Sequence, residues 1–480
     1  MDNCTPLILA DDKKQFEKEQ DELLKTVLNL RFFNPWRLRT SFSDMRSLQN
    51  DTNLEIYITN ACNQNCSYCY LPKYPDLYPK ECNDSKTILK NLKILYDFIV
   101  EQNFYIPTIS FFTGEIWHTQ LGWDILETTL TYIMEKQMQI GGISFPTNGY
   151  FAIKDETLQK LQQYINRFKN IGITLFPSIS IDGKYVDCNS RKRNNGIEYT
   201  DDFYDTLFAF AKINNTGFHP IISALDIDQW PQNFDWWCEQ CKKYNMDPIE
   251  SIMFLECRND DWTDDAIEKY CNFVISIADY YLTHECNNNV KVFADAVLGI
   301  THGQPGLDSY HPWVLTEAND FFGCTISQFL TVRLGDLAIC PCHRQAYEKY
   351  LYGKFVIENE KITDIKAINP YMAIKILMAN TKSAYHGCAS CIFKNVCLKG
   401  CLGSQLETVK DPFFPIPSVC KMFKTKYTRL VEYYTELGLF DYYAKYPIDT
   451  AEARIIAFLL QLKLDVEEYN NGTNVLSICQ

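Results

Sequence analysis

Three cysteines lie within eight residues of one another in the segment ACNQNCSYCYLP, residues 61–72. Cys62, Cys66 and Cys69 are separated by three and two residues, a spacing that lets three thiolates converge on one metal centre. A structural zinc site requires four protein ligands, and this loop contains neither a fourth cysteine nor a histidine. Three ligands leave one metal position open for a substrate or cofactor. A zinc site completed by a remote fourth ligand is the alternative.

A second set of cysteines lies between residues 324 and 420. It consists of Cys324, Cys340, Cys388, Cys391, Cys397, Cys401 and Cys420, and Cys342 lies two residues beyond Cys340. Metal binding contributes folding free energy, so metal centres would stabilise a loop-rich region whose own core is small. Iron–sulfur clusters are the favoured occupants, and zinc is the alternative.

The composition indicates a globular protein of a reducing compartment. Of 480 residues, 46% are hydrophobic and 22% are charged, and the formal net charge is −14. This acidic balance argues against a nucleic-acid partner. No stretch approaches the length of a membrane span and the first residues do not form a secretory signal, so we expect a cytoplasmic protein with no membrane partner. Because reducing compartments disfavour disulfides, clustered thiols there favour metal binding or chemistry.

Strand-like and helix-like segments alternate from residue 54 onward. The expected strands are 54–60, 108–114, 142–149, 172–183, 219–227 and 249–257, and the expected helices are 85–102, 121–137, 155–169, 201–213 and 233–245. This alternation predicts an α/β fold with parallel strands and helical crossovers, a partial (β/α)6 TIM barrel. The first cysteine loop directly follows the first strand, at the end of a barrel where catalytic residues gather.

The first loop resembles the signature of the radical S-adenosylmethionine (SAM) superfamily. That signature is C-x3-C-x2-C with an aromatic residue before the last cysteine, here Tyr68. The resemblance implies that the three thiolates bind a [4Fe–4S] cluster whose fourth iron chelates SAM. It further implies reductive cleavage of SAM to a 5′-deoxyadenosyl radical that abstracts hydrogen from a substrate.

Other strand ends resemble the SAM-contacting segments of the same family. FFTGEIW carries Gly114 and Glu115 where the family has Gly-Gly-Glu, with Thr113 in place of the first glycine. A carboxylate such as Glu115 suits the SAM ammonium group. The remaining positions that the resemblance assigns to SAM are Asn148 in PTNGY, Ser180 in SISIDG, near the ribose or carboxylate, and Arg191 or Arg193 as the partner of the carboxylate.

The second cysteine set resembles the SPASM extension of radical SAM maturases. The resemblance implies two auxiliary [4Fe–4S] clusters, and therefore three clusters in all. The outer cluster would be held by Cys388, Cys391, Cys397 and Cys420, and the inner one by Cys324, Cys340 and Cys401. Cys342 either closes the inner cluster or leaves one iron open to a substrate thiolate. Cys342 and His343 are also the candidate catalytic residues, although His343 as a surface or supporting residue is the simpler interpretation.

The resemblance favours an enzyme that modifies a ribosomally made peptide, by forming a thioether or carbon–carbon crosslink. An anaerobic sulfatase maturase that makes formylglycine is one alternative. It is less favoured because Pro341 follows Cys340, where those enzymes carry a proton-accepting aspartate. The other alternative to a peptide-modifying enzyme is a non-catalytic iron–sulfur electron carrier. Expected partners are a peptide or protein substrate and a reductant such as flavodoxin or ferredoxin. Residues 1–53 are too few for a winged helix, so leader recognition, where it is needed, is expected from a separate leader-binding protein, from residues 258–323 or from the helical tail.

The expected domain organisation has five parts. These are an N-terminal helical extension (1–53), the partial barrel (54–257), a helical and loop bridge (258–323), the SPASM domain (324–425) and a C-terminal helical tail (426–480).

Overall fold

The computed structural model describes nine stretches of the chain. They are residues 10–33, 53–73, 84–193, 199–284, 329–377, 387–395, 401–438, 440–441 and 453–472. Among the helices in these stretches, none has the length and apolar composition of a membrane-spanning segment.

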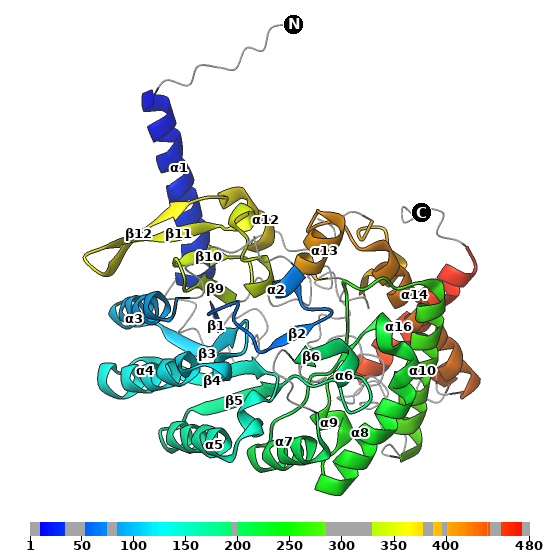
Figure 1. The fold of residues 1–480 in the computed structure, drawn as a ribbon. Helices are drawn as coiled ribbons and strands as arrows, with labels where there is room; N and C mark the ends of the chain where they lie inside the picture. Colours follow the sequence, from blue (N-terminus) through cyan, green and yellow to red (C-terminus); the bar gives the residue numbers. More distant parts are fainter. Residues whose placement is uncertain are drawn as a thin grey trace, which may run out of the picture.

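A mixed sheet of eight strands forms the centre of the molecule, in the order β12-β11-β10-β9-β1-β3-β4-β5. Five neighbouring strands are parallel, namely β9 (Phe329–Arg333), β1 (Asn53–Tyr57), β3 (Tyr105–Phe112), β4 (Gln139–Thr147) and β5 (Thr174–Ile179). The sheet then continues antiparallel through β10 (Ala338–Cys340), β11 (Gly353–Glu358) and β12 (Lys361–Ala367). The parallel strands place their carboxyl ends along one edge (Figure 1).

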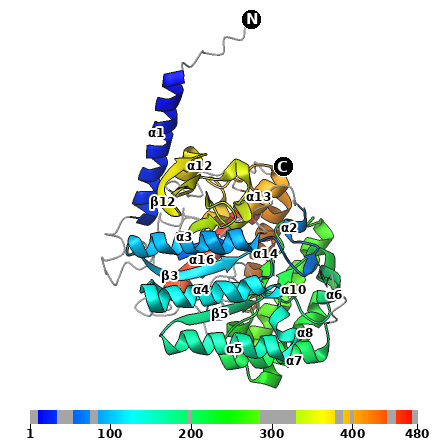
Figure 2. The same cartoon turned by 60° about the vertical axis from the view of Figure 1, so that its left-hand side comes forward.

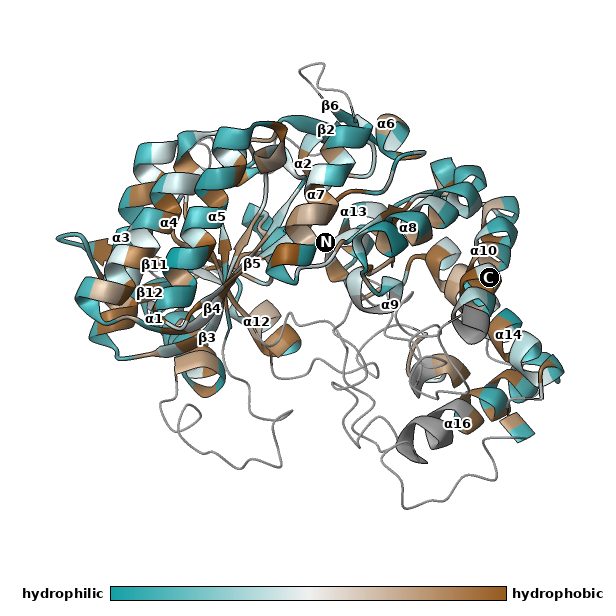
Figure 3. Cartoon of the chain, turned by 90° about the horizontal axis from the view of Figure 1, so that it is seen from below, coloured by the Kyte–Doolittle hydropathy of each residue, from teal (hydrophilic) through white to brown (hydrophobic). Residues whose placement is uncertain are grey.

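The predicted crossover helices are confirmed. They are α3 (Ser85–Glu101), α4 (Gln120–Lys136), α5 (Asp155–Asn170), α7 (Asp201–Asn214) and α8 (Trp230–Tyr244). Figures 1 and 2 show α3, α4 and α5 stacked along one face of the sheet. Alternate strand residues such as Leu54 and Ile56 pack into the core that these helices cover. Figure 3 shows that the strands are apolar and that the outward-facing turns of the helices are hydrophilic.

The fifth and sixth predicted strands are mostly wrong. Only Ile221–Ile222 (β7) and Leu255–Glu256 (β8) are strand, in a separate two-stranded sheet. Single parallel bridges join the last residue of β5, Ile179, to Phe218, and Phe218 to Ile252. The fifth and sixth segments therefore lie beside β5 in the predicted order. Ser223 ends β7 because its side chain caps a 3-10 helix over Ala224–Gln229, and residues 248–251 form the short helix α9 (Pro248–Ser251) instead of strand. In the described residues the strands form an open sheet, so the α/β order of the predicted partial barrel is present there and closure into a barrel is not shown.

The second cysteine region contains more regular structure than its loop-rich prediction. Strands β9 to β12 lie in it, and β9 pairs with β1 along its whole length. Its helices are α12 (Pro370–Leu377), α13 (Leu402–Val409) and α14 (Pro417–Glu436). Helix α14 packs on α10 (Asp264–His284) and on α16 (Ala453–Asn470). The prediction missed β9 because its partner β1 is almost three hundred residues away, whereas β10 to β12 pair with their neighbours in sequence.

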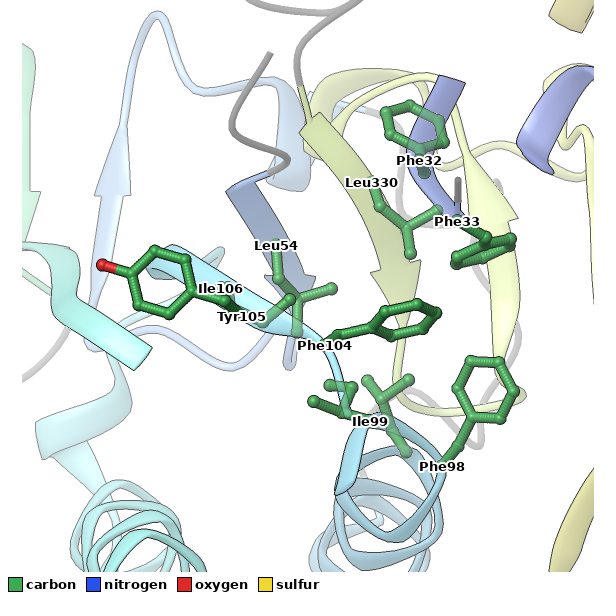
Figure 4. Close-up of a pocket in the computed structure, with 10 residues that line it drawn as sticks. Phe32, Phe33, Leu54, Phe98, Ile99, Phe104, Tyr105, Ile106 and Leu330 are labelled. Carbon is green, nitrogen blue, oxygen red and sulfur yellow. The ribbon is translucent and has the colours of Figure 1, made fainter. Parts of the chain in front are cut away.

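The amino ends of the strands are closed by the N-terminal segment. Helix α1 (Ala10–Leu28) and a π-helix (Asn29–Phe33) precede β1, and Phe33 stacks on Phe104 at 5.6 Å between ring centroids. An apolar pocket of about 20 Å³ lies at this end of the sheet, and the residues that line it include Phe32, Leu54 and Leu330 (Figure 4). The lining is apolar and offers no charged group to a ligand, so we interpret this end of the sheet as a packing surface for the N-terminal segment.

Candidate active site

The first cysteine loop lies at the carboxyl end of β1 and is held in place by backbone pairing. Strand β2 (Gln64–Cys66) pairs antiparallel with β6 (Arg191–Arg193), so that Cys66 lies opposite Arg191. The Cys69 N–H donates to the Cys66 carbonyl oxygen at 3.0 Å, which folds the C-x2-C segment into a turn that leads into α2 (Tyr70–Lys73). The backbone therefore brings the three predicted iron ligands into one loop at the edge predicted to be catalytic.

The three thiols influence one another's charge. Burial, together with the Glu115 carboxylate and the Cys69 thiolate, raises the pKa of Cys62 to about 12. Burial also raises the pKa of Cys66 to about 12 and raises that of Cys69. Thiolates at this half-buried position therefore need a compensating cation, and a metal centre would supply one.

Glu115 is a buried carboxylate at the carboxyl end of β3. Its oxygens accept hydrogen bonds from the Asn148 N–H at 2.6 Å, from the Thr147 hydroxyl at 3.1 Å and from the Trp117 N–H at 3.3 Å. A carboxylate has about four lone-pair sites, so three donors leave room for one more. This arrangement is compatible with the predicted ammonium contact.

The pKa of Glu115 is raised from 4.5 to about 7 because burial outweighs these hydrogen bonds. Between pH 4.5 and about pH 7, Glu115 carries a proton in the folded protein but not in the unfolded chain. Protonation of Glu115 therefore stabilises the folded protein fully below about pH 4.5, and this stabilisation is lost as the pH rises toward about 7. We expect the cluster-free protein to lose up to about 3 kcal/mol of stability between about pH 5 and about pH 8 through this group.

Urea unfolding of the wild type and of Glu115→Gln at both pH values measures this loss. The variant should show a smaller pH dependence. Glu127→Gln, which removes an exposed carboxylate paired with Arg167, is the control and should follow the wild type. An equal pH dependence in Glu115→Gln and the wild type would contradict the assignment.

Asn148 and Ser180 follow the next two strands. The Asn148 side chain donates to the Asn63 side chain at 2.9 Å and lies 3.9 Å from the Cys62 sulfur. The Ser180 N–H donates to the Thr147 carbonyl oxygen at 2.7 Å. Both residues therefore lie at the edge that carries the cysteine loop, and their contacts to SAM remain predictions.

Tyr68, Arg191 and Asp182 form a buried network behind the loop. The Tyr68 hydroxyl donates to Asp182 at 2.6 Å and accepts from Arg191 Nη1 at 2.6 Å. Arg191 also lies 3.3 Å from Asp182 and 3.9 Å from Asp187. Arg191, predicted to pair with the SAM carboxylate, thus already balances two buried aspartates that the sequence did not single out. For Arg193, the other candidate, the structure gives the backbone position in β6.

The segment before Glu115 has an unusual backbone. Gly114 has φ +64°, and a Cβ there would lie 2.2 Å from the Ala61 carbonyl oxygen, so only glycine fits. Thr113, which replaces the family's first glycine, has φ +78°, although a β-branched residue strongly disfavours this region. Its buried hydroxyl has no hydrogen-bond partner in the described part of the chain. Strain of this kind concentrates at functional sites.

Thr113→Gly is expected to raise the free energy of unfolding by about 1 kcal/mol, because the strain relieved exceeds the entropy that glycine loses. Thr113→Ala keeps a Cβ at positive φ and should gain less. Urea unfolding of the three cluster-free proteins measures the difference. A Thr113→Gly protein less stable than the wild type would show that the threonine conformation is not strained.

The structure describes six of the eight auxiliary cysteines. Cys324 and Cys397 lie outside the described residues. Cys388 and Cys391 share a turn in which the Cys391 N–H donates to the Cys388 carbonyl oxygen at 3.2 Å, as in the first loop. Cys340 ends β10, and Cys342 directly precedes a 3-10 helix. Cys401 lies at the start of α13, and Cys420 lies in the first turn of α14.

A half-buried arginine, Arg344, contributes charge to both cysteine regions. Arg344 pairs with Glu407 at 2.7 Å, and its charge lowers the pKa values of both Cys69 and Cys401. Burial acts to raise the pKa of Cys401, but Arg344 and the Ser404 N–H outweigh it, so this pKa is lowered overall. Arg344 thus favours thiolate at Cys401, and it was not singled out from the sequence.

No three His, Cys, Asp or Glu side chains among the described residues are arranged closely enough to hold a metal ion. The donor set nevertheless fits an iron–sulfur centre, because three half-buried thiols share one loop and soft thiolates are the ligands that such clusters require. The ligand assignments therefore rest on residue chemistry and loop position.

Comparisons with known proteins agree with this fold. No protein-family model and no curated protein matches the chain. A solved structure of native anSMEcpe with bound AdoMet matches with 14% identity and a TM-score of 0.52, over 82% of this chain and 100% of that one. Native anSMEcpe with bound AdoMet and Cp18Cys peptide matches with 15% identity and a TM-score of 0.52, over 81% and 98%. anSMEcpe is an anaerobic sulfatase-maturating enzyme, a SPASM radical SAM protein. The chain therefore has the fold of the radical SAM enzymes that carry a SPASM extension.

Proposed function

We propose that the protein is a radical SAM enzyme that modifies a ribosomally synthesised peptide. The observation that carries the proposal is the position of three thiols and a buried carboxylate at one sheet edge. Cys62, Cys66 and Cys69 follow β1, and Glu115 follows β3, its neighbour in the sheet. The similar structures contain AdoMet, and two contain a peptide, which supports SAM as cofactor and a peptide as substrate.

In this proposal the residues of the site divide the work of holding SAM. A [4Fe–4S] cluster on the three thiolates would supply the electron that cleaves SAM to methionine and a 5′-deoxyadenosyl radical. Glu115 would accept a hydrogen bond from the SAM ammonium, and Asn148 and Ser180 would contact the remainder of the molecule. Tyr68 and Asp182 fix the loop, since their 2.6 Å hydrogen bond joins it to the end of β5.

The product class that we propose is a crosslink, a thioether or a carbon–carbon bond. Pro341 follows Cys340 and cannot accept a proton, so the aspartate of the sulfatase maturases has no counterpart at this position. Eight further cysteines would hold two auxiliary clusters, with Cys342 and His343 as catalytic candidates. A flavodoxin or ferredoxin would supply electrons, and a separate protein would bind the leader. The five-part domain organisation given above is part of this proposal.

A peptide screen tests the function. The anaerobically reconstituted protein is incubated with SAM, dithionite and dodecapeptides that carry Cys, Ser, Thr or Ala at the centre and random residues elsewhere. We expect 5′-deoxyadenosine together with peptides that have lost two hydrogens and do not react with a hydrazide. Hydrazide-reactive products would indicate formylglycine instead, and intact SAM with every peptide would exclude both.

A further inference from the structure

Two buried side chains in the second cysteine region have polar atoms without partners. The Gln345 side chain is fully buried, and neither its carbonyl oxygen nor its amide nitrogen has a hydrogen-bond partner in the described part of the chain. The Ser404 hydroxyl is equally buried and is likewise unpaired among the described residues. A buried polar group destabilises a fold unless it is hydrogen-bonded, so each of these groups needs a partner.

Gln345 closes a turn that begins at Cys342. Its backbone N–H donates to the Cys342 carbonyl oxygen at 3.0 Å, within the 3-10 helix that Cys342 precedes. The same backbone hydrogen bond closes the turns Cys66–Cys69 and Cys388–Cys391, at 3.0 and 3.2 Å. In a turn of the 3-10 type the first and fourth side chains lie on the same side. Gln345 therefore occupies the position that a second cysteine occupies in the other two turns.

Ser404 lies in a second turn that begins at a proposed cluster ligand. Cys401 is the N-cap of α13, and the Gln405 N–H donates to the Cys401 carbonyl oxygen at 2.8 Å, which closes the first helical turn. Residues three and four positions beyond Cys401 lie on its side of the helix. The Gln405 side-chain nitrogen is paired, since it donates to the carbonyl oxygens of Pro412 and Phe414 at 3.0 and 2.9 Å. The Ser404 hydroxyl on the same side is not.

The two turns are held against each other. Arg344, which directly precedes Gln345, donates to Glu407 on α13 through Nε at 3.0 Å and through Nη2 at 2.7 Å. The Arg344 stem lies on Gly403, where an added Cβ would come within 2.5 Å of Arg344 Cγ. The unpaired groups of Gln345 and Ser404 thus come from adjoining turns. Each lies three residues beyond a cysteine that the proposed function assigns to an auxiliary cluster.

We propose that the Gln345 amide N–H and the Ser404 hydroxyl donate hydrogen bonds to the sulfur atoms of the inner auxiliary cluster. This inference rests on the proposed function, of which that cluster is a part. Hydrogen bonds to the sulfurs are among the features that set the reduction potential of an iron–sulfur cluster. They stabilise the reduced cluster more than the oxidised one, because the reduced cluster carries one more negative charge. The two side chains therefore raise the potential at which the inner cluster accepts an electron.

A redox titration of the reconstituted full chain, followed by electron paramagnetic resonance, measures this effect. Replacing all three cysteines of the first loop with alanine leaves only the auxiliary clusters in the spectrum. In this background we expect Gln345→Met to lower the reduced-to-oxidised ratio of one cluster at a fixed potential about tenfold, which is 59 mV for a one-electron couple. Ser404→Ala should shift the same cluster in the same direction by a smaller amount. Iron content should stay that of the background protein.

Gln405→Met is the matched control. Gln405 is also a buried glutamine of this region, but its amide is paired within the chain. Its replacement should leave the potentials of both auxiliary clusters unchanged.

Urea unfolding of the cluster-free full chain gives a second readout that needs no iron. Without the cluster the Gln345 amide has no partner in the fold, so Gln345→Met should lower the equilibrium constant of unfolding at least about fivefold. Gln405→Met removes two hydrogen bonds and leaves two carbonyl oxygens unpaired, so it should raise that constant at least about fivefold. A glutamine with a purely structural role would behave as Gln405 does.

Unchanged auxiliary potentials in Gln345→Met and Ser404→Ala, at full iron content, would overturn the inference and leave the proposed function intact. A cluster-free Gln345→Met protein that is destabilised as much as Gln405→Met would also overturn it. Wild-type protein whose auxiliary cysteines bind no iron would overturn the proposed auxiliary clusters themselves, and the inference with them.

Discussion

Replacing Cys66 with serine is expected to abolish 5′-deoxyadenosine formation. Cys66 is the central cysteine of the loop, and a serine oxygen is a poor ligand for the soft irons of a cluster. Loss of a residue that only supports a metal ligand lowers metal affinity or activity about 10–100-fold. Loss of a ligand itself should therefore lower the rate of 5′-deoxyadenosine formation at least about 100-fold. Iron content should fall by about one third, since one of three proposed clusters loses a ligand.

Cys188→Ser is the matched control for this substitution. Cys188 is an exposed thiol in the short helix α6 (Asp187–Ser190), outside both proposed ligand sets. It should retain wild-type iron content and activity. The assignment of Cys66 would be wrong if Cys66→Ser retained full iron and cleaved SAM as the wild type does, or if both variants lost activity equally.

Replacing Lys426 with methionine is expected to destabilise the protein by about 3–5 kcal/mol, because it leaves a buried charge without its counterion. Lys426 on α14 pairs with Glu256 on β8 at 2.9 Å, and neither side chain is exposed. The Tyr270 hydroxyl donates to the same Glu256 oxygen at 2.6 Å. This pair joins the helix that carries Cys420 to the two-stranded sheet of β7 and β8, so its loss should also lower the iron content.

Urea unfolding of the cluster-free protein measures this effect separately from metal. Lys421→Met on the same helix removes an exposed pair with Asp264 and should change the stability by less than about 1 kcal/mol. The double replacement Lys426→Met with Glu256→Leu should recover much of the loss, because no buried charge remains. A Lys426→Met protein as stable as the Lys421→Met control would show that the pair is not buried in solution.

The features that sequence predicted well are local. Amphipathic periodicity located α3, α4, α5, α7 and α8 to within a few residues, because it is written within each segment. Cysteine spacing likewise placed the first loop after the first strand, with Glu115 after the second. The resemblance to the radical SAM fold, drawn from these motifs, is confirmed at the level of fold.

The features that were missed depend on partners distant in sequence. Glu55 has no sequence feature that separates it from an ordinary strand residue, and its hydrogen bond to the His343 N–H forms because the chain returns beside β1 288 residues later. The sequence predicts that Arg191 pairs with a SAM carboxylate, because it does not show that Asp182 and Asp187 lie beside the guanidinium in the fold. The positive φ of Thr113 has no signature in residue type, since threonine disfavours it. Two-residue strands such as β7 carry too few residues to set a period.

Electron paramagnetic resonance of the reduced, anaerobically reconstituted protein tests the central claim most directly, with and without SAM. If the first cysteine loop holds a cluster with an open iron, SAM should change the signal of one cluster, and Cys66→Ser should lack that change. A spectrum that SAM leaves unaltered, from wild-type protein with a full complement of iron, would contradict the account.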